Sequence, residues 1–71
     1  MVSNEIILQL SKHIDKLRTE RNLSFQEMAD LCEMDKAQVY KICTKGVDLR
    51  TTSIAKIAKG LEIPIYGLFE F

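Results

Sequence analysis

The sequence predicts an all-α fold of five short helices. Apolar residues recur at spacings of three and four along most of the 71-residue chain, which is the periodicity of amphipathic helices, and no alternating strand pattern appears. Capping residues precede the apolar runs. A chain of this length forms one domain, 1–71, with a modest core, and its 46% hydrophobic content argues against disorder.

The first helix is expected from Asn4 to Arg21. Its core face is predicted to consist of apolar residues spaced by four, four and three: Ile6, Leu10, Ile14 and Leu17. Asn22 follows this run, and asparagine tolerates the left-handed conformation that often ends a helix. The segment therefore has both a periodic face and a stop signal.

The second and third helices each begin with a capping pattern. Ser24 and Glu27 form a capping box for the second helix, and Asp35 with Gln38 in the reciprocal position starts the third. The predicted inward residues are Met28, Ala29 and Cys32 in the second helix and Val39, Ile42 and Cys43 in the third. Only Glu33 and Met34 separate the two helices, so they are expected to cross at a steep angle.

A turn and two further helices complete the expected fold. Gly46 can adopt positive φ in the turn Lys45-Gly46-Val47-Asp48. The capping candidates of the fourth helix are Thr51, Thr52 and Ser53, and its inward residues are Ile54, Ile57, Ala58 and Leu61. Gly60 is either a weak spot or a point of close packing. Pro64 suits the first turn of a short last helix, Ile65 to Phe69.

Charge is balanced overall but unevenly distributed. The formal net charge is zero. The stretch from Lys36 to Lys59 holds six basic residues and one acidic residue, a local excess of five positive charges, and the remainder carries the opposite excess. A neutral chain can therefore present a basic face, although lysines on exposed helices are also commonplace.

Several classes of protein are disfavoured by the sequence. No apolar run approaches the roughly 18 residues of a membrane span, and Met1 to Ile7 does not resemble a signal peptide, so a cytoplasmic protein with reduced cysteines is expected. Two cysteines and one histidine cannot by themselves build a four-ligand zinc site. Neither a metal nor a cofactor is expected. No nucleophile, base and orienting group stand out, so an enzyme is not expected.

Two capped helices joined by a short break are a helix-turn-helix candidate, in which the second helix enters the major groove of DNA. The outer side of the third helix carries the candidate base-reading residues: Lys36, Ala37, Gln38, Tyr40 and Lys41. Lysine can donate to guanine, glutamine can pair with adenine, and alanine can contact a thymine methyl group. Tyr40 could alternatively pack its ring on a neighbouring side chain.

Arg18 to Ile65 resembles the phage repressor and Cro-like helix-turn-helix family, also called the xenobiotic response element (XRE) family. The matching stretches are LRTERNLSFQEMADLCEM, AQVYKI and LRTTSIAKIAKGLEIPIYGLF. The resemblance implies a five-helix, lambda-repressor-like DNA-binding domain that regulates transcription, commonly as a repressor, by binding double-stranded operator DNA as a homodimer. It assigns base reading to the five residues above. The residues that it implies for backbone contact are Ser24, Phe25, Gln26, Lys45, Arg50 and Thr51.

The chain departs from the family pattern at three side chains and in the placement of one glycine, because the glycine before the fourth helix is displaced to Gly46. Phe25 stands where the family commonly has Gln, and Glu33 stands where it commonly has a glycine with positive φ. Cys43 replaces the acid that often pairs with the family's arginine, so Arg18 needs another partner, and Glu20 or Asp48 are the candidates.

The last nine residues are too apolar for a free terminus. Part of this segment is expected to close the core, and the excess to pack against a second copy. The predicted dimer residues are Ile65, Tyr66, Leu68, Phe69 and Phe71. Phe25 and Leu31 either tuck into the edge of the core or form a protein-contact patch, whereas Cys32, Cys43 and His13 are expected to be structural. The alternative function is an antitoxin-like protein-interaction module with a second protein partner.

Overall fold

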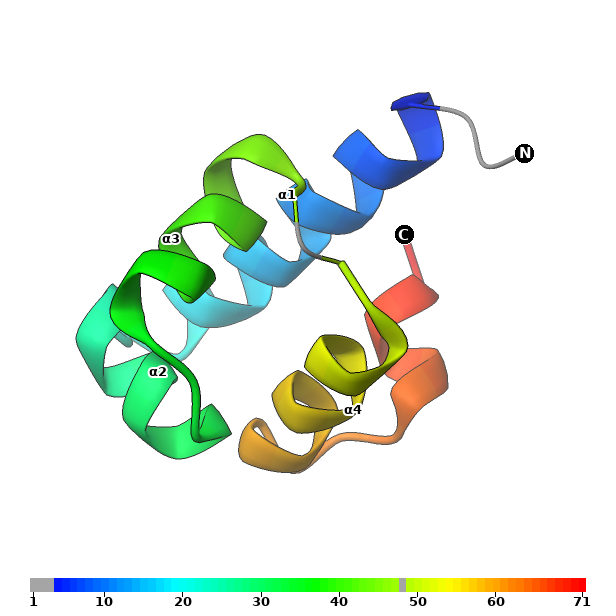
Figure 1. The fold of residues 1–71 in the computed structure, drawn as a ribbon. Helices are drawn as coiled ribbons and strands as arrows, with labels where there is room; N and C mark the ends of the chain where they lie inside the picture. Colours follow the sequence, from blue (N-terminus) through cyan, green and yellow to red (C-terminus); the bar gives the residue numbers. More distant parts are fainter. Residues whose placement is uncertain (1–3, 48) are drawn as a thin grey trace.

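The computed structural model describes residues 4–47 and 49–71, and within them the chain is helical with no strand. The elements are α1 (Asn4–Glu20), α2 (Phe25–Cys32), α3 (Lys36–Lys45), α4 (Thr51–Gly60) and the 3-10 helix η1 (Ile65–Phe69) (Figure 1). The all-α prediction is confirmed. The count of five α-helices is not confirmed, because the last element is a 3-10 helix of five residues.

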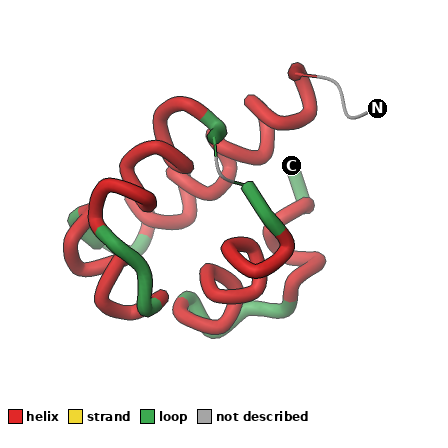
Figure 2. Tube along the Cα trace, in the orientation of Figure 1, coloured by secondary structure: helices red, strands yellow, loops and turns green. Residues whose placement is uncertain are grey.

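The helices enclose one core. α3 packs against α1 and α2, α2 packs against α4, and η1 packs against both α4 and α1 (Figure 2). The C-terminal segment therefore returns to the helix that begins the described chain. Leu68 of η1 is 0% exposed and belongs to this core, so the last helix completes the hydrophobic interior.

The predicted inner faces are confirmed with one exception. All the predicted inward residues of α2 and α3 are buried, and so are Leu10 and Ile14 of α1. Four inward residues were predicted for the fourth helix, and three of them are buried: Ile57, Ala58 and Leu61. Leu17 and Ile54 are half-buried against the core. The prediction for Ile6 is wrong, because it is 48% exposed. Ile6 lies in the first turns of α1, where it lines an open apolar hollow with Phe69 instead of the closed interior.

Each of the four α-helices is followed, one or two positions after its last residue, by a residue in the left-handed conformation: Asn22, Glu33, Gly46 and Glu62. The predictions for Asn22 and Gly46 are confirmed, whereas Asp48 of the predicted turn lies outside the described residues. At the three non-glycine ends, the next backbone N–H donates to the carbonyl five positions back: Leu23 to Arg18 (3.1 Å), Met34 to Ala29 (2.9 Å) and Ile63 to Ala58 (3.0 Å). This is the Schellman arrangement, which satisfies carbonyls that the helix itself leaves unpaired.

The predicted caps are formed at one helix start out of three. The Ser24 hydroxyl accepts from the Glu27 N–H at 3.0 Å, and the Glu27 carboxylate accepts from the Ser24 N–H at 2.8 Å, so the capping box of α2 is confirmed. Asp35 is the N-cap of α3 but makes no side-chain cap bond, so the predicted box with Gln38 is wrong. Arg50 is the N-cap of α4, and the predicted threonine or serine cap there is also wrong. The three candidates lie within the first turn of α4 itself, one residue or more past the capping position.

Candidate nucleic-acid interface

α2 and α3 form a helix-turn-helix unit. Glu33 adopts φ 56° and ψ 47°, which reverses the chain directly after Cys32, and Asp35 returns it to an extended conformation before α3 begins. The left-handed turn expected of the family is thus present although glutamate replaces glycine. The inner faces of both helices join the common core, which leaves the outer side of α3 facing away from it.

Four of the five predicted base-reading residues share that outer side. Lys36, Ala37, Tyr40 and Lys41 are exposed, and their spacing places them on one face of the helix, whereas Gln38 is half-buried beside it. Thr44 continues the same face one turn further on. Its position four residues after Tyr40 was a signal that the sequence interpretation missed. The Thr44 hydroxyl donates to the Tyr40 carbonyl at 2.6 Å, so its backbone contact limits what else it can donate to.

The cations on and after α3 are exposed to solvent. Lys36, Lys41, Lys45 and Arg50 are exposed. No carboxylate of residues 4–47 or 49–71 forms an ion pair with any of them, since the ion pair found there joins Arg18 to Asp15. Exposed cations on one helix and the following loop, with no ion-pair partner in the described part of the chain, create a local positive field, which is the electrostatic condition for contact with phosphates.

The six residues expected at the DNA backbone fall into two groups. Lys45, Arg50 and Thr51 are exposed, in or near the connection between α3 and α4. At the start of α2, the other three already have partners within the chain. The Ser24 side chain caps the helix, the Gln26 amide donates to Asp30 at 2.9 Å, and Phe25 is half-buried.

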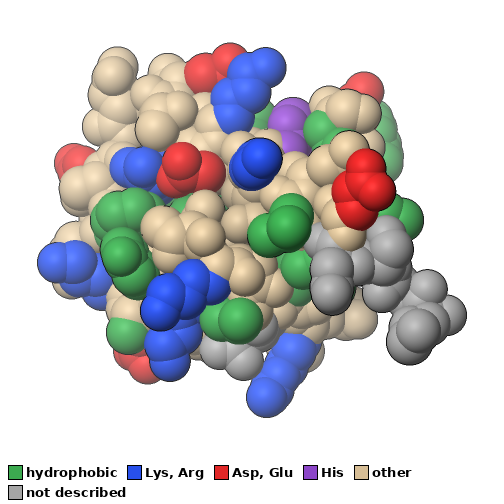
Figure 3. All heavy atoms as spheres, turned by 90° about the horizontal axis from the view of Figure 1, so that it is seen from above, with side chains coloured by type: hydrophobic (Ala, Val, Ile, Leu, Met, Phe, Trp, Pro, Cys, Tyr) green, Lys and Arg blue, Asp and Glu red, His purple; other side chains and the backbone are tan. Residues whose placement is uncertain are grey.

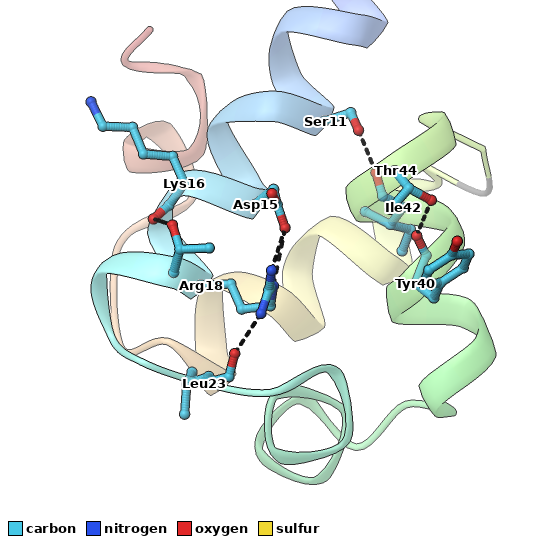
Figure 4. A network of polar contacts seen from close by, with 9 residues as sticks. Ser11, Asp15, Lys16, Arg18, Leu23, Tyr40, Ile42 and Thr44 are labelled. Atoms are coloured by element: carbon cyan, nitrogen blue, oxygen red, sulfur yellow. Dashed lines mark hydrogen bonds and ion pairs between the residues drawn. The ribbon is translucent and has the colours of Figure 1, made fainter.

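Arg18 is held by its own helix and by the loop after it (Figure 4). Its Nε and Nη2 donate to one oxygen of Asp15 at 3.0 and 2.9 Å, and its Nη1 donates to the Leu23 carbonyl at 2.6 Å. The expected partner Glu20 is therefore wrong, and Asp48 lies outside the described residues. Asp15 stands three residues before Arg18, a spacing that brings side chains together on a helix and that the sequence interpretation overlooked.

Arg18 contacts Phe25, and Phe25 contacts Tyr40 on the outer side of α3. The Arg18 guanidinium carbon lies 4.2 Å from the centre of the Phe25 ring, and the Phe25 and Tyr40 rings meet edge to face at 5.3 Å. Tyr40 is nevertheless 47% exposed, so it packs on a neighbour and also reaches the surface. Phe25 thus lies at the edge of the core, and Leu31 remains exposed.

The two cysteines and the histidine are engaged within the fold. Cys32 and Cys43 are free and buried, and burial raises the pKa of both, that of Cys43 to about 11. His13 Nε2 donates to the Gly67 carbonyl at 3.0 Å, which ties α1 to η1. Within residues 4–47 and 49–71, no three histidine, cysteine or acidic side chains are grouped to hold a metal ion. No helix of this part of the chain is long and apolar enough to cross a membrane.

The C-terminal segment divides between core and surface. Four of the predicted dimer residues are exposed: Ile65, Tyr66, Phe69 and Phe71. Leu68 is the exception, because it is fully buried in the core of its own chain and offers no surface to a second copy.

In the view from above, hydrophobic side chains reach the surface between lysine and arginine side chains (Figure 3).

The fold and this surface define a helix-turn-helix domain. A family model described as a Cro/C1-type HTH DNA-binding domain matches residues 13–71, which is most of the chain. The chain therefore belongs to the Cro/C1-type helix-turn-helix family, and the resemblance seen in the sequence is confirmed. Comparison with curated proteins gives no match. Domains of this family bind DNA, which agrees with the exposed cations of α3.

Proposed function

We propose that this chain is a transcriptional regulator that binds an operator in double-stranded DNA, with α3 in the major groove. The observation that carries the proposal is the outer face of α3, where Lys36, Ala37, Tyr40 and Lys41 are exposed and both lysines lack an internal ion-pair partner among the described residues. In this arrangement the exposed cations after α3 neutralise phosphates, and the side chains of α3 select the sequence.

The active species in this proposal is a homodimer. Tyr66 is 70% exposed, and Ile65, Phe69 and Phe71 are also exposed, so the end of the chain presents apolar surface that a second copy would cover. A two-fold dimer places two recognition helices about 34 Å apart, one turn of DNA. Sedimentation of Tyr66→Glu against the parent chain tests this: the parent sediments as a dimer and the variant as a monomer. A monomeric parent at micromolar concentration refutes the dimer.

The binding experiment uses labelled DNA from upstream of the chain's own gene, a scrambled duplex and several salt concentrations. Tight binding to the native duplex alone, weakening steeply with salt, is expected. Random-sequence selection follows if the native duplex is not preferred. The proposal fails if selection enriches no sequence.

Lys41→Ala tests the role of α3, with Lys12→Ala as a matched control on the exposed side of α1. If Lys41 contacts a base, its loss weakens specific binding by roughly 1–3 kcal/mol and relaxes selectivity at one position. An equal loss on every sequence assigns Lys41 to phosphate instead. Lys12→Ala should leave both affinities unchanged, and an equal effect of the two variants would remove the special role of α3.

A second candidate function is a protein-interaction module of the antitoxin kind. The side chain of Leu31, near the end of α2, favours it, because Leu31 is exposed and lines a surface hollow with residues at the end of α4, none of which belongs to the predicted DNA-contacting or dimer residues. Stoichiometric co-purification of a second protein, lost in Leu31→Glu, would support this function over DNA binding alone.

A further inference from the structure

Phe25 occupies a position from which the family commonly contacts phosphate, but its side chain cannot make that contact. A phenyl ring has no hydrogen-bond donor, and it is half-buried here instead of standing free at the start of α2. The structure places it between Arg18 and Tyr40. The contacts that Phe25 does make are therefore those with Arg18 and Tyr40.

The contacts form a continuous series from α1 to the outer side of α3. Asp15 and the Leu23 carbonyl hold the Arg18 guanidinium through three hydrogen bonds of 2.6 to 3.0 Å. That guanidinium covers one side of the Phe25 ring at 4.2 Å. Phe25 in turn meets Tyr40 edge to face, with ring centres 5.3 Å apart and an interplanar angle of 77°. Each group in the series therefore contacts the next.

Tyr40 is the end of the series and also part of the proposed DNA-reading face. Its ring is supported by Phe25 on one side and is about half exposed. A side chain that is already held in one orientation loses less conformational freedom when it binds. The ring can make apolar contact with a thymine methyl group, and its hydroxyl can donate or accept a hydrogen bond at a base edge.

We propose that Phe25 is a positioning residue for DNA recognition, which holds the Tyr40 ring in the orientation that selects a base pair. This inference rests on the proposed function. It makes Phe25 a determinant of sequence specificity that acts through Tyr40, in place of the phosphate contact common at this position in the family.

The test is random-sequence selection followed by affinity measurement for the parent chain, Phe25→Leu, Tyr40→Leu and the double variant. The two single variants should relax selectivity at the same base pair, and each should lose about two- to tenfold in affinity for the preferred sequence. The double variant should bind no more weakly than Tyr40→Leu alone. Phe25→Tyr keeps the ring and should retain the selectivity of the parent.

Because Phe25 is half-buried, urea unfolding must show that each variant is folded under the binding conditions. Phe25→Met, which keeps an apolar side chain of similar volume without a ring, replaces Phe25→Leu if the latter unfolds. The inference is overturned if the Phe25 variants weaken all sequences equally while Tyr40→Leu relaxes one base pair, or if the two losses multiply in the double variant. A parent chain without sequence preference would overturn the proposed function itself, and this inference with it.

Discussion

Replacing Gly60 by alanine should destabilise the fold, although alanine is the better helix former. Gly60 is the last residue of α4, and a Cβ atom there would lie 2.6 Å from the Cys32 sulfur, 2.9 Å from the Cys32 Cα and 2.9 Å from the Leu31 carbonyl oxygen. Two of these three atoms belong to the backbone of α2, so the clash cannot be relieved by a side-chain rotation. The two helices would have to move apart.

The expected magnitude follows from two opposing effects. Alanine gains about 0.5–1 kcal/mol over glycine in a helix, whereas overpacking a close contact costs about 1–3 kcal/mol or more. We expect overpacking to dominate, because backbone atoms are involved, with a net loss of about 1–2 kcal/mol. For a domain of this size, each kcal/mol lowers Tm by about 4–8 °C. Urea and thermal unfolding followed by circular dichroism measure both quantities.

Gly67→Ala is the matched control. The nearest atoms to a Cβ at Gly67 are 3.6 to 3.7 Å away, which is ordinary contact, so its effect should stay within about 0.5 kcal/mol. Cys32→Ala combined with Gly60→Ala should remain less stable than Cys32→Ala alone, because the two backbone contacts persist. The reasoning is refuted if Gly60→Ala is as stable as the parent chain.

Three further predictions concern helix ends and buried thiols. Glu33→Gly should raise the free energy of unfolding by about 0.5–1 kcal/mol, because Glu33 has φ 56°, a conformation that glycine adopts without strain. Glu20→Gly, at a helical position, should lower the free energy of unfolding. A lower free energy of unfolding in both variants would contradict the argument. The Ser24 N–H and hydroxyl lower the pKa of Glu27 from its ordinary value of 4.5, so the stability contributed by this carboxylate is fully present above pH 4.5 and is lost as the pH falls through the lower folded pKa. Urea unfolding from pH 7 to 2 should show this loss in the parent and not in Glu27→Gln, and parallel curves would show that the carboxylate contributes nothing. Burial raises the pKa of Cys43 to about 11, so iodoacetamide at pH 8 should label this thiol only as fast as the chain unfolds. Rapid labelling of the folded chain would show instead that the thiol is accessible.

Local patterns predicted most of the helical structure, because helix periodicity and capping depend on residues close in sequence. The buried faces of α2 and α3 and the box of Ser24 and Glu27 were predicted in this way and are confirmed. The same local reasoning failed at the start of α4, where three candidate capping residues follow one another: Thr51, Thr52 and Ser53. It placed the cap of α4 on a threonine or serine, and the helix begins one residue earlier, after Arg50.

Other features depend on the meeting of distant segments. Phe25 and Tyr40 are fifteen positions apart, and nothing in the spacing indicates that their rings touch. Leu68 and Phe69 are adjacent apolar residues, yet one is fully buried and the other exposed, because the orientation of η1 on α1 and α4 decides which of them faces the core. The sequence prediction therefore placed both residues in the dimer interface, although Leu68 is buried in its own chain.

The sequence by itself determined that the chain is all-α, that a helix-turn-helix lies near its middle and that Lys36, Ala37, Tyr40 and Lys41 lie on the outer side of α3. These are consequences of local periodicity and of hydrogen bonds between near neighbours. Only the tertiary structure decided that the Phe25 ring packs against Tyr40 instead of standing free, and that α2 and α4 meet at Gly60. Close packing makes these choices, since each side chain takes the space that its neighbours in three dimensions leave to it.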